Sequence, residues 1–317
     1  MLPAQAIGSE QIDRRIGRPC GYVESTFGIR QRFWANADET SSAMAATASK
    51  RALEEANWLP ESLDLIVGGC GVMEQPIPGT APLVQRRLGL GSSGIPAVDV
   101  NATCLSFLLA LDHVLAAFAL GRAKRALIFT ADIASAALDF NKHEGSVIFG
   151  DGATAFALSA DGPHQWLASR LETFGDGADL CRLEAGGTRL RPHEDLQGFL
   201  ANSTFQMDGP GVFRATARRL PAMMDRLLES AGLKQRQLDT IVPHQASATA
   251  LEFLKRSLPD GHARTIDIFR DHGNQIATSL PHALHVARTT GRLRPGTHAL
   301  LIGSSAGISL GGAVVRW

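Results

Sequence analysis

The sequence predicts an α/β fold with mostly parallel strands, because short apolar runs alternate with amphipathic segments along all 317 residues. Four runs have the composition of buried strands, and they span residues 63–67, 95–100, 125–130 and 238–242. Five segments have helical periodicity, and they span residues 41–57, 81–88, 104–120, 212–231 and 246–258. Residues 176–206 lack clear periodicity and are expected to form an irregular insertion.

A second observation is that the order of elements repeats along the chain. In each half a helix leads through a Gly-Arg turn, Gly121-Arg122 or Gly291-Arg292, to an apolar strand and then to a Gly-rich strand. The Gly-rich strands are expected over residues 146–158 and 308–316. We therefore predict two duplicated halves, residues 1–160 and residues 161–317, that share one cleft.

Composition excludes several classes of protein. The chain carries 31 Lys and Arg against 31 Asp and Glu, so no net charge attracts nucleic acid or an anionic membrane. A hydrophobic share of 44% excludes a disordered chain, and the first residues lack the apolar core of a signal peptide. The most apolar stretch, residues 105–120, is shorter than the roughly 20 residues that span a bilayer. The cysteines include no CxxC pair, so we expect a reduced, cytoplasmic protein. From the charge balance and the short apolar stretch, we expect it to bind neither nucleic acid nor membrane.

Two motif-like patterns do not support their usual functions. Residues 89–94 match GxGxxG, but a predicted helix precedes them and a predicted strand follows. This order is the reverse of a dinucleotide-binding loop, so we interpret the match as a helix C-cap. His282 and His285 have the spacing of metal ligands, yet the chain has neither an HExxH motif nor a cysteine cluster. We therefore expect no bound metal.

Cys104 stands between the predicted strand 95–100 and the helical segment that follows it. At a helix N-terminus, free backbone N–H groups and the helix dipole stabilise a thiolate. A nucleophile on a sharp strand-to-helix turn is also the logic of the nucleophile elbow. A buried structural cysteine is the alternative. A catalytic role for Cys104 therefore depends on suitable partner residues.

His244 and Asn274 are the candidate partners. His244 lies in the turn after the predicted strand 238–242, whereas His272 lacks such a context. Asn274 follows Gly273, a residue that lets the backbone turn the amide toward a cleft. The strand ends of a doubly wound sheet meet in one crevice, so we expect these side chains to converge with Cys104. A cysteine with these two hydrogen-bonding partners has the composition of a nucleophilic site.

The three residues, in these contexts, resemble the ketoacyl-ACP (acyl carrier protein) synthase III group of the thiolase superfamily. The supporting motifs run in order along essentially the whole chain, at residues 27–32 (FGIRQR), 102–107 (ATCLSF), 149–153 (FGDGA), 242–246 (VPHQA), 272–274 (HGN) and 303–307 (GSSAG). The resemblance implies a five-layered αβαβα fold of two duplicated halves. In that fold the first half carries the nucleophilic cysteine, the second carries His and Asn, and two copies form a homodimer.

The resemblance also implies an acyltransferase of fatty acid or polyketide biosynthesis that performs a decarboxylative Claisen condensation. Cys104 would take the acyl group from an acyl-CoA or acyl-ACP thioester, with the N–H groups of Cys104 and Ala306 as the oxyanion hole. His244 and Asn274 would then hold the thioester oxygen of malonyl-ACP while CO2 leaves. The implied protein has no resident cofactor, because both thioesters are substrates.

The chain departs from the family pattern where CoA is held. The family's Trp and Arg for the CoA adenine fall at Tyr22 and Thr26, two further arginines fall at His143 and Thr249, and an Asn falls at Pro210. Loss of three guanidinium groups removes bidentate phosphate contacts, so simple acetyl-CoA priming is not expected. An acyl-ACP donor and a CoA held in another way both remain open.

Further family positions concern the partner protein, the acyl pocket and the first sheet. Four cations are candidates for docking an acidic carrier protein, with a solvated helix face as the alternative: Arg214, Arg218, Lys255 and Arg256. Ile77 falls where the family often has a bulky aromatic that enters the partner subunit's tunnel, so we expect an acyl donor longer than acetyl.

Pro221 is expected to kink or end the helix that carries Arg214. The chain begins where the family's first strand ends, so an edge of the first sheet is expected to need another cover.

Three rival functions are compatible with the same scaffold. The main alternative is an acyltransferase that moves the acyl group from Cys104 to an alcohol or amine without decarboxylation. Asn274 favours condensation, because decarboxylation needs a second hydrogen-bond donor to the enolate oxygen. A catalytically idle partner subunit is disfavoured by the intact Cys104, His244 and Asn274 set. A thiolase would need a cysteine within residues 303–307, which contain none.

Overall fold

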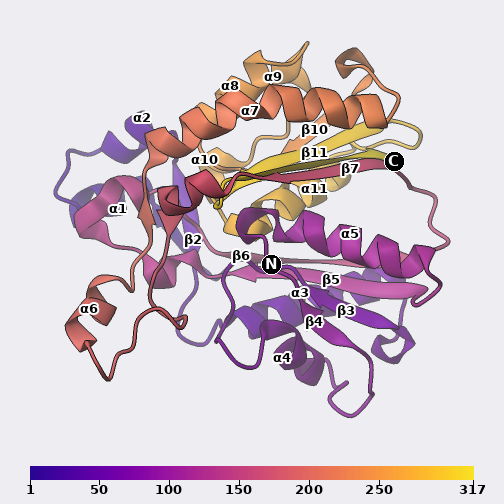
Figure 1. Ribbon diagram of the computed structural model, residues 1–317, viewed down its shortest axis with the longest axis horizontal. Coiled ribbons are helices and arrows are strands. Elements are labelled where there is room, and N and C mark those ends of the chain that lie inside the picture. Colours follow the sequence, from indigo (N-terminus) through magenta and orange to yellow (C-terminus); the bar gives the residue numbers. More distant parts are fainter.

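Two four-stranded sheets form the framework of the computed structural model (Figure 1). It describes residues 1–317, apart from the side chains of residues 142–144, so the departure at His143 lies outside the described side chains. The first sheet contains, in spatial order, β4 (Ala97–Asp99), β3 (Leu65–Gly68), β5 (Arg125–Asp132) and β6 (Gly152–Ser159). The second contains β10 (Thr240–Pro243), β11 (His298–Ser305), β12 (Ser309–Arg316) and β7 (Gln165–Thr173).

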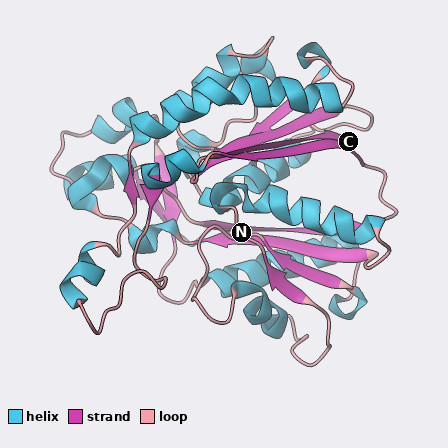
Figure 2. Cartoon of the chain, viewed as in Figure 1, coloured by secondary structure: helices cyan, strands magenta, loops and turns pink.

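Helices form layers on both outer faces of the sheets and between them. The outer face of the first sheet packs against α3 (Ser41–Ala56) and α4 (Thr80–Arg87). The central layer consists of α5 (Ser106–Ala119) and α11 (Ser279–Thr289), which share one apolar cluster with both sheets. The outer face of the second sheet packs against α7 (Gly209–Ser230) and α8 (Ala248–Arg256). Figure 2 shows these alternating layers, and the predicted five-layered αβαβα fold is confirmed.

Smaller elements surround the layers. Two strands, β1 (Gln5–Gly8) and β2 (Gln31–Trp34), pair antiparallel and enclose α1 (Ser9–Arg15) and α2 (Tyr22–Phe27) in the sequence. Residues 176–206 are mostly irregular and contain β8 (Cys181–Arg182), which pairs with β9 (Gln206–Met207), and the projecting α6 (Leu196–Ala201). The remaining helices are α9 (Gly261–Arg264) and α10 (Phe269–His272). No helix in the described chain is long and apolar enough to cross a membrane.

The long helix α7 begins at a side-chain cap and passes through a proline. The Asp208 carboxylate accepts a hydrogen bond from Gly211 N at 2.9 Å, which satisfies a free N–H of the first turn. Pro221 lies inside the helix, which continues to Ser230, so Pro221 does not end it. Leu220 and Met223, on either side of Pro221, are buried in the cluster against the second sheet. This packing holds the two parts of the helix together although proline supplies no N–H.

Three strands of each sheet correspond in order and direction, β3-β5-β6 in the first and β10-β11-β12 in the second. In the first, β3 and β5 are parallel and β5 and β6 are antiparallel. In the second, β10 and β11 are parallel and β11 and β12 are antiparallel. This agreement is what a duplication requires, while the boundary near residue 160 stays a prediction.

The outer edge of β6 differs from its counterpart. In the second sheet, β7 pairs with β12, but in the described chain β6 has only β5 as a partner strand. Met1 alone pairs at this edge, through two backbone hydrogen bonds with Ala153. Most of β6 therefore has one free edge.

Close backbone contacts join the two halves where glycines permit them. Asn274 N donates to Ile148 O at 2.7 Å, and Gly150 N donates to Asn274 O at 3.0 Å. Gly273 has φ of +66°, and a Cβ there would lie 2.6 Å from Ile148 O. A Cβ at Gly150 would clash with the carbonyl oxygen of His272. Both glycines are therefore needed for this junction, which fixes Asn274 relative to the first half.

Substitution of Gly150 tests this junction. We expect Gly150→Ala to lower the free energy of unfolding by about 1–3 kcal/mol, because the added methyl meets a backbone carbonyl that cannot move freely. The measurement is urea unfolding followed by circular dichroism. Gly175→Ala is the control, because a Cβ there meets nothing within 4 Å. An equal effect of both substitutions would contradict the role of the junction.

Candidate active site

One cavity of about 1160 Å³ is lined by all three of Cys104, His244 and Asn274. Cys104 comes from the turn before α5, His244 from the end of β10, and Asn274 from the loop after α10. The first residue belongs to the N-terminal half and the other two to the C-terminal half. The structure thus brings together the three side chains that the sequence singled out.

The turn that carries Cys104 is held by hydrogen bonds on both sides. Cys104 lies in a 3-10 turn, Thr103–Leu105, that directly precedes α5. Thr103 has φ of +50°, an uncommon conformation for a residue with a branched side chain. Ser106 Oγ donates to Thr103 O at 2.7 Å, and Thr103 N donates to Asn101 Oδ1 at 2.8 Å. The strand-to-helix turn is therefore tight, as a nucleophile elbow requires.

The environment of Cys104 favours the thiol and not the thiolate. Burial raises the pKa of Cys104, and electrostatic repulsion from Asp132 and then from Cys181 raises it further. Only the backbone N–H of Cys104 itself acts in the opposite direction. The expected stabilisation of a thiolate by the helix N-terminus is thus outweighed, because the desolvation penalty of the charged sulfur exceeds the stabilisation from one backbone N–H group.

Asp132 is a buried acid that the sequence analysis did not single out. It ends β5, and its Oδ1 accepts hydrogen bonds from Gly71 N and Val72 N, each at 2.8 Å. Its Oδ2 accepts from Thr278 N at 3.1 Å and from Thr278 Oγ1 at 3.2 Å. Burial raises its pKa to about 7. Asp132 therefore ties the segment that carries Gly71 and Val72, which line the cavity, to the loop after Asn274.

His244 is a buried, neutral imidazole at this cavity. Burial lowers its pKa to about 4, so the ring is uncharged at neutral pH. Its Nδ1 has no hydrogen-bond partner among the described residues. A neutral imidazole carries one N–H, and with the proton on Nε2 it can donate to a substrate oxygen.

Hydrogen bonds fix the orientation of the Asn274 amide. Its Oδ1 accepts from Ile276 N at 2.9 Å, and its Nδ2 donates to Ala246 O at 3.2 Å. The amide nitrogen has two N–H groups, of which one is used by Ala246. The other is available to a ligand in the cavity, which gives the site a second neutral hydrogen-bond donor.

The glycine-rich turn near the C-terminus lies against the other site elements. Ser305 Oγ donates to Ala102 O at 2.7 Å, which ties the turn containing Ala306 to the turn of Cys104. A Cβ at Gly303 would lie 2.7 Å from the Cβ of His244, so only glycine allows β11 to pass this close. Ala306 lines the same cavity as Cys104, the arrangement expected of two backbone oxyanion donors.

The inner wall of the cavity is largely apolar. Cys181 and Phe205 of the insertion contribute to it, together with Leu138 and Met207. Sequence reasoning missed these residues, because their segment has no periodicity that shows which side chains face inward. Ile77 does not line the cavity of its own chain and is 87% exposed.

The positions where the chain departs from the family pattern lie around this cavity. Tyr22, Thr26, Thr249 and Pro210 all line it. Arg214 and Arg218 are exposed on α7 and form no ion pair within the described chain. Lys255 and Arg256, in contrast, are paired with Asp267 and Glu252. Among the described residues no group of three or more His, Cys, Asp and Glu could hold a metal ion. Of the two histidines with the spacing of metal ligands, His282 pairs with a side-chain amide, its Nδ1 lying 2.7 Å from Gln275 Oε1.

Comparisons with known proteins identify the family of the chain. The family model for 3-oxoacyl-[acyl-carrier-protein] synthase III matches residues 98–177, and the model for its C-terminal part matches residues 228–317. A β-ketoacyl-[acyl-carrier-protein] synthase III of Neisseria gonorrhoeae is 32% identical over 317 residues, which cover 100% of this chain and 96% of the relative. The chain belongs to the β-ketoacyl-ACP synthase III family. As a member of that family it is an acyltransferase-class enzyme with the thiolase fold.

A second relative in sequence and one solved structure extend the match. The synthase III of Erythrobacter litoralis is 34% identical over 320 residues, which cover 100% of this chain and 96% of the relative. The crystal structure of the synthase III from Aquifex aeolicus superposes with a TM-score of 0.88 at 28% identity, covering 100% of this chain and 97% of that one. The family match therefore extends over the whole synthase III fold.

The raised pKa of Cys104 makes a prediction for its reactivity. We expect its alkylation by iodoacetamide to accelerate steadily between pH 7 and pH 10, because the thiolate is the reacting species and burial keeps it rare. The measurement is the mass of the Cys104 peptide over time, with Cys104→Ala to identify it. A rate that levels off below pH 8 would show instead that the thiolate is stabilised in the resting site.

Proposed function

We propose that this family member is a ketosynthase that transfers an acyl group to Cys104 and condenses it with malonyl-ACP. The observation that carries the proposal is the pair of neutral hydrogen-bond donors, His244 and Asn274, on the wall of the cavity that contains a buried thiol. Neutral donors match an oxygen that becomes negative only during the reaction, and they stabilise it most at that stage.

The first half-reaction is transfer of the acyl group between two sulfurs. Cys104 Sγ attacks the thioester carbonyl, the bond to the sulfur of the carrier thiol breaks, and the proton of Cys104 ends on that leaving sulfur. The backbone N–H groups of Cys104 and Ala306 stabilise the tetrahedral oxyanion. Because the thiol is the resting form, its proton leaves only when a thioester is in place.

The second half-reaction forms a carbon–carbon bond. The malonyl carboxylate leaves as CO2, and its electron pair enters the thioester as an enolate, whose oxygen accepts hydrogen bonds from His244 Nε2 and Asn274 Nδ2. The enolate carbon attacks the acyl carbonyl on Cys104, and the β-ketoacyl product leaves. Cys104 departs as a thiolate and takes one proton from solvent, which its raised pKa favours.

The cavity mouth supports an acyl donor other than acetyl-CoA. Tyr22, Thr26 and Thr249 line the cavity at the family positions for CoA, and none of them carries a positive charge for a phosphate. Arg214 and Arg218 are free cations on the neighbouring helix α7 that an acidic carrier protein can meet. We infer that the acyl donor arrives on ACP and that malonyl-ACP docks on the same face.

We further propose a homodimer in which Ile77 completes the partner subunit's acyl tunnel. The side chain is exposed and stands outside the cavity of its own chain, as expected for a residue that serves the other copy. Strand β4 is at a free sheet edge, and Val98 on it is exposed. We propose no resident cofactor, and the cytoplasmic location expected from the sequence stays a prediction.

One experiment separates condensation from its rivals. Wild type and Cys104→Ala are incubated with acyl-CoA and acyl-ACP donors of increasing chain length, and the mass of the Cys104 peptide is measured. Malonyl-ACP is then added, and a β-ketoacyl product is sought. An acylated Cys104 that yields product only with an alcohol or amine would favour the simpler acyltransferase. No acylation from any donor would overturn the proposal.

Asn274→Ala separates the two half-reactions. We expect Cys104 to be acylated at close to the wild-type rate, whereas condensation falls by about 10²–10³, because only the enolate loses a hydrogen-bond donor. Single-turnover measurements of each half-reaction test this. Because Asn274 also bonds Ile276 N, thermal unfolding serves as the control for folding. Equal losses in both half-reactions would contradict the assigned role.

Ile77→Phe tests the tunnel. We expect the bulkier ring to reduce acylation by donors longer than acetyl by about tenfold, since it fills space that an aliphatic residue leaves open. Acylation is measured by mass over a series of saturated chains. Leu59→Phe is the control, because Leu59 is also exposed but is not a residue that the proposal assigns to the partner's tunnel. Acylation of wild type by acetyl alone would refute the proposed length preference.

A further inference from the structure

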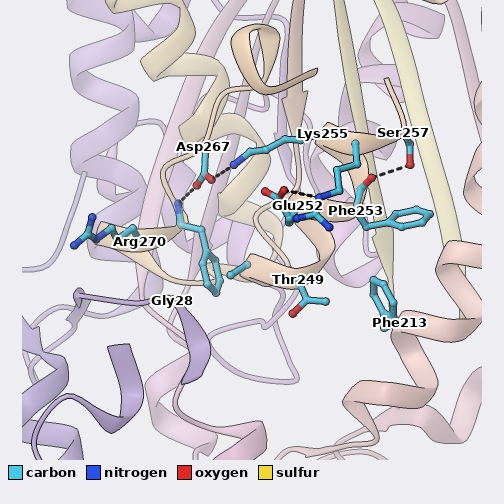
Figure 3. Close-up of a pocket in the computed structure, with 12 residues that line it drawn as sticks. Gly28, Phe213, Thr249, Glu252, Phe253, Lys255, Ser257, Asp267 and Arg270 are labelled. Carbon is cyan, nitrogen blue, oxygen red and sulfur yellow. Dashed lines mark hydrogen bonds and ion pairs between the residues drawn. The ribbon is translucent and has the colours of Figure 1, made fainter. Parts of the chain in front are cut away.

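A second hollow, of about 770 Å³, forms a vestibule to the active-site cavity (Figure 3). It shares Phe213, Thr249 and Phe253 with the lining of that cavity, so the two spaces adjoin. Phe213 of α7 and Phe253 of α8 meet edge to face, with ring centroids 5.7 Å apart. Phe213 and Phe253 thus contribute to the walls of both hollows.

Cations of the vestibule are already paired within the chain. Lys255 Nζ lies 2.7 Å from Asp267 Oδ2, and its side chain is only 16% exposed. Asp267 also accepts a hydrogen bond from Phe269 N at 3.0 Å, which fixes the carboxylate. Figure 3 shows Lys255 directed toward Asp267. Lys255 is therefore held by the fold and is poorly placed to meet a partner protein, contrary to what its position in the sequence indicates.

Arg256 is paired differently. Its Nε lies 2.8 Å from Glu252 Oε1, one helical turn earlier on α8, and the arginine side chain is 75% exposed. The same Glu252 oxygen lies 3.4 Å from His262 Nε2. On the other side of the vestibule, Arg270 pairs with Glu24 at 2.8 Å. An exposed pair within one helix is weak, so a stronger anionic partner can exchange with it.

We propose that Glu252 is an intramolecular counter-ion that holds Arg256 until an acidic carrier protein displaces it. This inference rests on the proposed docking of ACP and adds a specificity-determining residue to it. Arg214 and Arg218 give the first attraction, because they carry no counter-ion in the described chain. Arg256 changes partner from Glu252 to a carboxylate of the carrier. Glu252 thereby penalises weakly acidic proteins, which cannot compensate for the lost pair.

Neutralising Glu252 tests the proposal. We expect Glu252→Gln to tighten binding of malonyl-loaded acyl carrier protein roughly two- to fivefold at low salt, because Arg256 is then free. The gain is expected to shrink as ionic strength rises. The measurement is the Kd from calorimetry with the full chain carrying Cys104→Ala, so that no acyl transfer or condensation occurs. Glu55→Gln is the matched control, since Glu55 pairs with Arg288 away from the vestibule.

A double substitution identifies the mechanism. The gain from Glu252→Gln is expected to disappear in an Arg256→Gln background, because there is no cation left to release. If the gain persists there, Glu252 acts only by its own repulsion of the carrier, and the proposal is wrong. An equal gain for acyl-CoA would overturn the assignment to a carrier protein.

Absence of carrier binding would also overturn this inference. The proposed function is tested separately by acylation of Cys104 from a pantetheine thioester, which does not need the vestibule cations. Acylation without carrier binding would leave the chemistry standing and remove the docking role. Carrier binding without acylation would support the docking role and overturn the proposed chemistry.

Discussion

The site depends on one backbone junction between the two halves of the chain. Asn274 exchanges hydrogen bonds with Ile148 and Gly150, and two glycines allow the chains to approach closely enough to form them. This contact places an amide from the second half in the cavity that holds a cysteine of the first. Since Ser305 ties the Ala306 turn to Ala102, a second cross-contact fixes the other side of the same cavity. Catalysis by groups from both halves is possible because these junctions leave them little freedom to move.

Burial keeps the reacting groups uncharged until a substrate enters. It raises the pKa of Cys104 and lowers that of His244 to about 4, so a thiol and a neutral imidazole line the resting cavity. Asp132 adds to the effect, because its buried carboxylate disfavours a second negative charge at Cys104. In the proposed reaction, charge therefore appears only on the transferred groups, where the proposed N–H donors can stabilise it.

The entrance follows a different electrostatic rule. Cations around the vestibule are balanced by carboxylates of the same chain, except on α7, where Arg214 and Arg218 have no ion-pair partner in the described structure. Exchange of ion pairs suits a carrier protein that must bind and dissociate in every cycle, because the cations of this chain pair again with its own carboxylates once the carrier has left. In the proposed function the interior thus selects the reaction, and the entrance selects the protein that delivers the substrate.

The sequence by itself determined the α/β alternation and singled out the three central side chains, and its resemblance to a known family implied the layer order. Strand and helix periodicity is local, and the motifs around Cys104, His244 and Asn274 mark the ends of elements that must meet in an α/β fold. Only the tertiary structure decided the protonation states, because burial and the charge of Asp132 come from segments remote in sequence. It also decided that Pro221 stays within α7, since packing of Leu220 and Met223 on the second sheet outweighs the local preference. The pairing of Lys255 with Asp267 could not be predicted from the sequence either, because the spacing of charges along a helix does not show which loop faces them.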